Sequence, residues 1–174
     1  MSNGKSHLVW EVYDLQRTCR LNFKYWSSKL VVCRRFNFWL EYSLLVTAPG
    51  SAVAGFVFWK TESGEIVWTI LTLTTAFLGI AKPLLRLTDR IERLQKVATA
   101  YRAIEYQIEE LASDIRRDDK YSAEMVTTFK RIQKQVQEAS RDEPVENANE
   151  NLRRQCFEVV KQELPDTSFH IPSI

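Results

Sequence analysis

The chain has little of what most enzymes use for catalysis. Among its 174 residues are only five glycines, too few for a phosphate-binding loop of the usual kind. Its two histidines, His7 and His170, stand in isolated positions near the termini. No nucleophile elbow and no zinc-spaced set of cysteine and histidine occurs. The composition therefore argues against an enzyme, and it predicts no catalytic residue, no metal site and no cofactor.

Charge is almost absent from one long stretch, residues 36–85. Its charged residues are Glu41, Lys60, Glu62, Glu65 and Lys82, whereas both flanks are densely charged. At about 1.5 Å per residue, the run 36–59 exceeds the roughly 30 Å hydrocarbon core of a bilayer. The run 66–85 reaches that length if the Lys82 side chain extends to the interface. We therefore predict a transmembrane hairpin with spans at about 36–59 and 66–85.

The distribution of positive charge sets the orientation of this hairpin. The turn holds a single lysine, Lys60, whereas lysines and arginines cluster before residue 36 and from Lys82 onward. By the positive-inside rule both termini face the cytoplasm, and the expected location is the cell inner membrane. The cysteines Cys19, Cys33 and Cys156 then lie in cytoplasmic segments, where thiols stay reduced.

Outside the hairpin, apolar residues recur at helical spacing. Residues 1–35 are typical of an amphipathic interfacial or cytoplasmic helix, and residues 86–164 of a cytoplasmic helical region. That region carries a coiled-coil seam, which favours self-association or a hairpin within one subunit: Leu87, Ile91, Leu94, Ala98, Tyr101, Ile108, Leu111 and Ile115. The tail, 165–174, shows no periodicity and is predicted to be flexible. The expected fold class is an all-α membrane protein.

Three residues of the first span are candidates for a pore or a gate. Glu41 lies near the cytoplasmic boundary, where its carboxylate either extends toward Arg34 or Lys82 or belongs to a charge ring at the mouth of an oligomeric pore. Pro49 and Gly50 lie near the middle of the span and predict a kink. The kink serves either packing of the hairpin or gating.

The second span carries hydroxyl and small residues. The candidates are Thr69, Thr72, Thr75, Gly79 and Lys82, of which the last four share one helix face. Hydroxyl groups in hydrocarbon need partners. They either bond within the helix or to a neighbouring helix, or they line a wet path formed by several subunits.

Three basic groups lie in the predicted cytoplasmic region, away from lipid. They are Arg116, Arg117 and Lys120, then Lys130, Arg131 and Lys134, then Arg153 and Arg154. Together with Tyr121 they are candidates for holding a phosphate-bearing ligand, such as an oligonucleotide, by backbone charge and base stacking. The alternative is an ordinary solvated helix face.

The order of these features resembles the SLATT family, the two-transmembrane effectors of bacterial antiphage defence. The residues that carry the likeness are the Tyr25-Trp26 pair, the basic residues Lys29, Arg34 and Arg35, the threonine- and glycine-bearing second span, and Lys82-Pro83 after it. The resemblance covers nearly the whole chain. Within the family, the chain looks most like the membrane subunit of Hailong-type systems.

The resemblance implies an oligomeric pore-forming effector that depolarises the infected cell. Its cytoplasmic helices would sense a nucleotide-derived ligand such as short single-stranded DNA. The implied partners are further copies of the chain, with a tetramer favoured, membrane lipids and a functionally paired nucleotidyltransferase. Two other interpretations stay open, a non-conducting membrane anchor or scaffold that recruits a cytoplasmic enzyme, and a lipid-remodelling protein.

Overall fold

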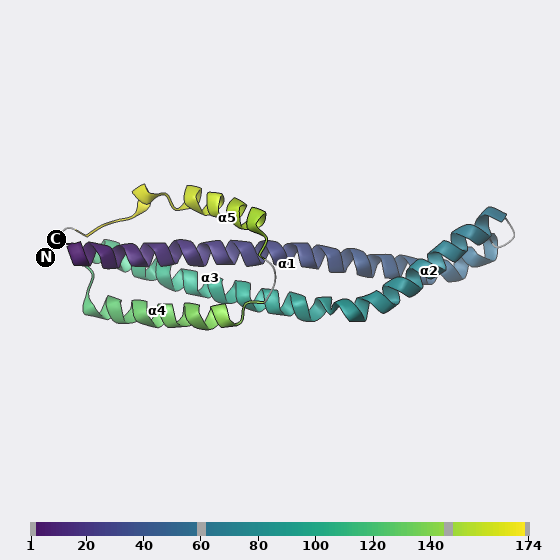
Figure 1. The fold of residues 1–174 in the computed structure, drawn as a ribbon, viewed down its shortest axis with the longest axis horizontal. Coiled ribbons are helices and arrows are strands. Elements are labelled where there is room, and N and C mark those ends of the chain that lie inside the picture. Colours follow the sequence, from purple (N-terminus) through teal and green to yellow (C-terminus); the bar gives the residue numbers. More distant parts are fainter. Residues whose placement is uncertain (1–2, 59–61, 145–147, 173–174) are drawn as a thin grey trace. The chain divides into compact units, whose positions relative to one another are not determined.

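The computed structural model consists of helices joined by short connections (Figure 1). It describes residues 3–58, 62–144 and 148–172, except for the side chains of residues 3–8, 46–58, 62–65, 67, 68 and 71. The helices are α1 (Asn3–Phe58), α2 (Glu62–Leu85), α3 (Leu87–Asp118), α4 (Ala123–Arg141) and α5 (Glu150–Glu163), followed by the 3-10 turn η1 (Asp166–Ser168). These ranges contain no strand, which confirms the all-α class.

The predicted N-terminal helix and the first predicted span form one continuous helix, α1. A boundary was expected near residue 35, where the sequence changes from charged to apolar. Residues 34–38 contain neither glycine nor proline, so nothing there interrupts the backbone hydrogen bonds of the helix. The second predicted span falls within α2.

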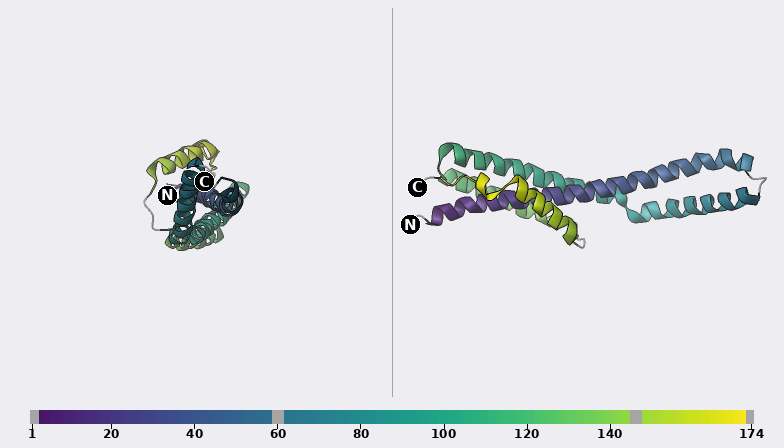
Figure 2. Two further views of the ribbon diagram at one scale, coloured as in Figure 1. Left: turned by 90° about the vertical axis from the view of Figure 1, so that its right-hand side faces the viewer. Right: turned by 90° about the horizontal axis from the view of Figure 1, so that it is seen from above.

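Residues with left-handed backbone geometry end α2 and α3. Arg86, at φ 42°, lies three residues after Pro83, whose nitrogen has no hydrogen to donate within the helix. Asp119, at φ 47°, ends α3 inside the polar cluster 116–120. In the sequence this cluster interrupts the seam and predicts a turn or a second, antiparallel helix. The side chain of Ser122 then caps α4 by accepting from the Met125 amide at 3.3 Å. The predicted break is confirmed, and α4 runs back beside α3 (Figures 1 and 2).

Contacts divide the chain into two units, each described here by itself. The first, the helical unit, comprises residues 1–29 and 93–174, and the second, the hairpin unit, comprises residues 30–92. The N-terminal segment, residues 1–29, is thus grouped by its contacts with residues 93–174. It belongs to the helical unit because its side chains, such as Val12 and Tyr13, are buried there.

The helical unit has an apolar core between α1, α3 and α4. The α3 side chains in this core include six of the eight predicted seam residues, together with Val97, Ile104 and Ala112. The six are Leu94, Ala98, Tyr101, Ile108, Leu111 and Ile115. They are met by Val12 and Cys19 of α1 and by Phe129 and Ile132 of α4, all of which are buried. Each such aliphatic or aromatic side chain contributes about 1.5–3 kcal/mol on burial. The seam is thus satisfied within a single chain, one of the two alternatives that its periodicity left open.

The tail packs against α1. The Tyr13 hydroxyl donates to the carbonyl of His170 at 2.8 Å, and the Phe169 ring stacks on that of Tyr13 with centroids 4.3 Å apart. Arg17 donates from Nε to the carbonyl of Leu164 at 3.0 Å. Phe169 and His170 of the tail therefore lie against α1, and the flexibility expected of the tail stays a prediction. They dock by stacking and hydrogen bonding rather than by a periodic apolar face, so a periodicity search does not detect them.

In the hairpin unit many of the large apolar side chains that the structure describes are exposed. On α2 six of them recur at steps of four and three, each more than half exposed: Ile66, Ile70, Leu73, Phe77, Ile80 and Leu84. On α1, Phe36, Phe38, Trp39 and Leu45 are exposed to a similar degree. Within the described residues, no helix combines the length and the hydropathy that a membrane span requires.

Candidate functional site

The structure pairs the two charged candidates of the hairpin unit. Lys82 Nζ lies 3.2 Å from Glu41 Oε1, with the lysine side chain 43% and the glutamate side chain 51% exposed. This is one of the two partners that the sequence suggested for Glu41. Because each charge neutralises the other, both are cheaper to hold beside apolar surface than either alone.

The other hairpin candidates lie along α2. Thr69, Thr72 and Gly79 are exposed and Thr75 is half-buried. A Cβ built at Gly79 meets no atom within 4 Å, so this glycine is not needed for close packing inside the chain. Pro49 and Gly50 fall among the α1 residues whose side chains lie outside the description, and the kink predicted there stays a prediction.

The basic groups of the helical unit do not gather into one site. Arg117 forms ion pairs with Asp114 at 2.8 Å and Asp118 at 3.3 Å on its own helix. It shares a groove with Arg131, but the same groove is lined by four carboxylate residues: Glu110, Asp114, Asp118 and Glu124. The excess of negative charge makes this groove unsuitable for phosphate.

The remaining candidates are distributed over separate surfaces. Arg116 lies 3.5 Å from the Ser168 carbonyl, at the docked tail. Arg153 lines a different cavity, beside Trp26 and Glu143. The α4 and α5 helices that carry the last two groups lie on opposite sides of α1 (Figures 1 and 2). Lys120, Lys130, Lys134 and Arg154 are exposed.

Tyr121 differs from the stacking platform that the sequence suggested. Its hydroxyl is buried and has no hydrogen-bond partner within the described residues. Burial, assisted by the carboxylate of Glu11, raises the pKa of Tyr121 to about 12. A side chain held in this way is a packing element rather than a free face for a nucleic-acid base.

Sequence reasoning missed the charged network at the centre of the helical unit. Arg20 of α1 pairs with Glu105 through Nε and with Glu109 through Nη2, the latter at 2.7 Å. Arg20 also lies 3.5 Å from Glu163 of α5, which Lys24 reaches at 2.7 Å. The Glu105 side chain is 0% exposed. This network connects three helices.

The spacing of the seam residues in α3 could have indicated the buried carboxylate of this network. Its steps of four and three pass from Tyr101 to Ile108 with one member missing, and the missing position is Glu105. A carboxylate at a core position of a heptad needs a buried cation, and Arg20 supplies it. The gap in the apolar pattern therefore marks a fully buried charge of the helical unit.

Two further titratable side chains, Cys19 and Tyr101, are buried near this network. Burial, together with the negative charge of Glu105, raises the pKa of the Cys19 thiol to about 12. Burial also raises the pKa of Tyr101, as does the Glu143 carboxylate that accepts from its hydroxyl at 2.6 Å. Both groups stay protonated at neutral pH, so Cys19 is not a nucleophile.

These shifts predict a loss of stability at alkaline pH. The ordinary pKa of Cys19 is 9.0 and its folded value is about 12, so the unfolded chain loses the proton first as pH rises. The contribution of the protonated Cys19 thiol to the free energy of unfolding is complete below pH 9. Between pH 9 and about pH 12 it decreases by about 1.4 kcal/mol per pH unit. Urea unfolding from pH 8 to 11 should show a shallower decline in Cys19→Ala. Val12→Ala controls for lost packing, and equal slopes in all three proteins would contradict the prediction.

Comparison of the chain with protein-family models, with curated proteins and with solved structures found no match.

Proposed function

We propose that this protein is an oligomeric, pore-forming membrane effector, with the hairpin unit in the bilayer and the helical unit as a ligand-responsive cytoplasmic domain. The observation that carries the proposal is the outward apolar surface of the hairpin unit. Ile70, Leu73 and Phe77 expose 58%, 65% and 71% of their surface, although soluble monomers rarely expose large contiguous apolar patches. Such a surface can be buried by lipid tails or by further copies of the chain.

The ion pair of the hairpin unit fits the same proposal. A charge in the hydrocarbon region costs roughly 2.5–3.5 kcal/mol at the bilayer centre and less toward its edge. Glu41 and Lys82 reduce that cost by pairing at 3.2 Å. In an oligomer, a ring of such pairs would stand at the cytoplasmic mouth of the pore.

The threonine face of α2 is the proposed pore lining. Thr72, Thr75 and Gly79 lie on one side of the helix together with Lys82. The open space beside Gly79 leaves room for a neighbouring helix at this height. Two helices enclose no pore alone, so the proposal requires several subunits, and a tetramer is the favoured number.

The ligand-responsive part of the proposal is supported by exposed cations and by the resemblance to the SLATT family. Within the described residues, Lys130 and Lys134 of α4 form no ion pair, so their charge is available to a phosphate-bearing ligand such as short single-stranded DNA. A functionally paired nucleotidyltransferase would supply that ligand.

The deciding experiment is ion flux from liposomes that contain the purified full-length protein, with and without short single-stranded DNA or cyclic oligonucleotides. We expect flux that a nucleotide switches on or off. Thr72→Leu and Thr75→Leu should reduce it by about tenfold or more, because leucine removes polar groups from the wet path. Thr74→Leu is the matched control, since Thr74 lies on a different face of the helix from Thr72, Thr75 and Gly79.

Indifference of the flux to both Thr72→Leu and Thr75→Leu would exclude a pore lined by α2. Absence of flux from folded, oligomeric protein in every condition would instead favour a membrane anchor that recruits a cytoplasmic enzyme. Leakage of lipid vesicles without ion selectivity would favour lipid remodelling.

A further inference from the structure

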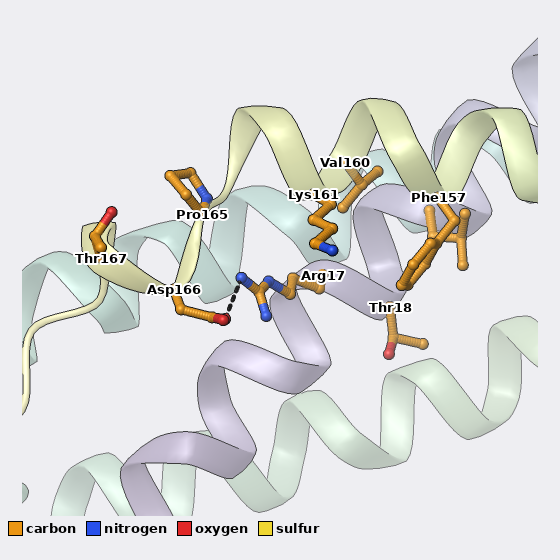
Figure 3. Close-up of a pocket in the computed structure, with 9 residues that line it drawn as sticks. Arg17, Thr18, Phe157, Val160, Lys161, Pro165, Asp166 and Thr167 are labelled. Carbon is orange, nitrogen blue, oxygen red and sulfur yellow. Dashed lines mark ion pairs between the residues drawn. The ribbon is translucent and has the colours of Figure 1, made fainter.

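A cavity of about 370 Å³ lies between α1 and α5 in the helical unit (Figure 3). It is closed at one end by the strap, defined here as residues 164–170. The lining residues are Arg17, Thr18 and Leu21 of α1, Phe157, Val160 and Lys161 of α5, and Pro165, Asp166 and Thr167 of the strap. The volume is in the range of about 300–1,000 Å³ that small-molecule sites occupy.

Much of the cavity wall is apolar. Leu21, Val160 and Pro165 contribute hydrocarbon, and Phe157 adds an aromatic ring that is 51% exposed. An exposed phenylalanine beside a cavity gains from any apolar group that covers it. The shape and the chemistry of the wall therefore suit an apolar body of moderate size.

Of the two basic side chains that line the cavity, Arg17 and Lys161, one forms an ion pair and the other does not. Arg17 is occupied, because its Nη2 lies 2.6 Å from Asp166 Oδ1 and 2.5 Å from the Leu164 carbonyl. Asp166 is thereby neutralised as well. Lys161, in contrast, forms no ion pair with any described residue. One positive charge at the cavity is thus left without a carboxylate.

The close-up shows how this charge relates to the apolar wall. Lys161 and Phe157 both point from α5 toward the α1 side of the cavity, where Arg17 and Thr18 lie (Figure 3). The Thr18 hydroxyl donates to the carbonyl of Asp14 at 2.8 Å, so it is not available as a donor to a ligand. The ammonium of Lys161 is then a cationic donor at the cavity that no described carboxylate engages, and the Thr167 hydroxyl lies in the same lining.

We propose that this cavity binds a small amphiphilic monoanion, with its apolar body against Phe157 and Leu21 and its carboxylate on the Lys161 ammonium. A charged hydrogen bond fixes the head group, and the wall selects an aromatic or branched aliphatic body. The site lies wholly within the helical unit and does not depend on membrane insertion or on a pore.

The test is calorimetric titration of the full-length protein with 2-naphthoate, in a solution in which the protein does not aggregate. The heat of the same titration without protein is subtracted. Lys161→Gln should weaken binding by about tenfold, because the variant loses a charged hydrogen bond. Thr18 is an exposed residue on the rim of the cavity, and Thr18→Trp should abolish the binding of 2-naphthoate because the indole ring fills the cavity. Lys96→Gln, at a lysine of α3 that is 72% exposed and does not line the cavity, is the matched control and should bind as the parent does.

A second probe separates charge recognition from general apolar binding. The cation 2-naphthylmethylammonium has nearly the same body and should bind more weakly than 2-naphthoate to the parent protein. Equal binding of 2-naphthoate by the parent, Lys161→Gln and Thr18→Trp would overturn the proposal, as would no binding at millimolar concentration. Either result leaves the flux experiment unaffected, so the two proposals fail independently.

Discussion

Replacing Arg20 with leucine is expected to reduce the unfolding free energy of the helical unit by about 3–5 kcal/mol. The guanidinium of Arg20 is only 18% exposed and contacts Glu105, Glu109 and Glu163. Its removal takes away the more buried of the two cations that contact the fully buried carboxylate of Glu105. The one that remains, Arg102 at 2.8 Å on the same helix, is 36% exposed and compensates the buried charge only in part. A buried charge that loses its partner costs far more than an exposed one. Urea denaturation followed by circular dichroism measures the loss.

Two variants make this prediction specific to burial. Arg117→Leu removes a guanidinium that is 71% exposed and paired with Asp114 and Asp118, and it should change stability by no more than about 0.5 kcal/mol. The double variant Arg20→Leu with Glu105→Leu removes both buried charges and should be more stable than Arg20→Leu alone. A double variant that is less stable than Arg20→Leu would contradict the prediction, because the loss of stability would then not come from an uncompensated charge on Glu105.

Breaking the pair of Glu41 and Lys82 is expected to have the second-largest effect if the hairpin lies in a bilayer. Lys82→Leu leaves the Glu41 carboxylate unpaired beside hydrocarbon, at a cost of up to roughly 2.5–3.5 kcal/mol. The charge-exchanged protein, Glu41→Lys with Lys82→Glu, should recover most of the loss because the atoms meet again at about the same place. Thermal unfolding of the protein in lipid nanodiscs measures both effects.

An exposed ion pair elsewhere provides the control. Lys96 lies 2.8 Å from Asp142 in the helical unit, with side chains 72% and 51% exposed. Lys96→Leu should cost less than about 1 kcal/mol, as is usual for surface pairs. Similar small losses for Lys82→Leu and Lys96→Leu would mean that Glu41 and Lys82 stand in water, and would contradict the bilayer placement.

Local features of the molecule were open to prediction from sequence. Helical periodicity predicted the all-α class, and the polar cluster after Ile115 predicted the turn that Asp119 makes. Seven of the eight predicted seam residues are buried, Ile91 being the exception, and Leu94 and Ile108 are almost inaccessible. Lys82 was also one of the two named partners of Glu41. These features depend on residues within a few turns of one another or on a two-helix hairpin with a short connection.

Features that join distant parts of the chain were not predictable in this way. The bond from Tyr13 to His170 spans 157 residues and that from Arg20 to Glu105 spans 85. The same is true of the basic groups, which look alike in sequence although Arg117 shares its groove with four carboxylates and Arg153 lines a different cavity.

The sequence by itself thus determined which segments are helices, where α3 ends, and which faces are apolar, because hydrogen bonding along a helix and side-chain periodicity are local properties. Only the tertiary structure decided which charges are neutralised and which are open to a ligand. A buried guanidinium such as Arg20 and an exposed ammonium such as Lys161 differ in their surroundings rather than in their residue type. Those surroundings are supplied by α3, α5 and the strap, which meet α1 only when the chain has folded.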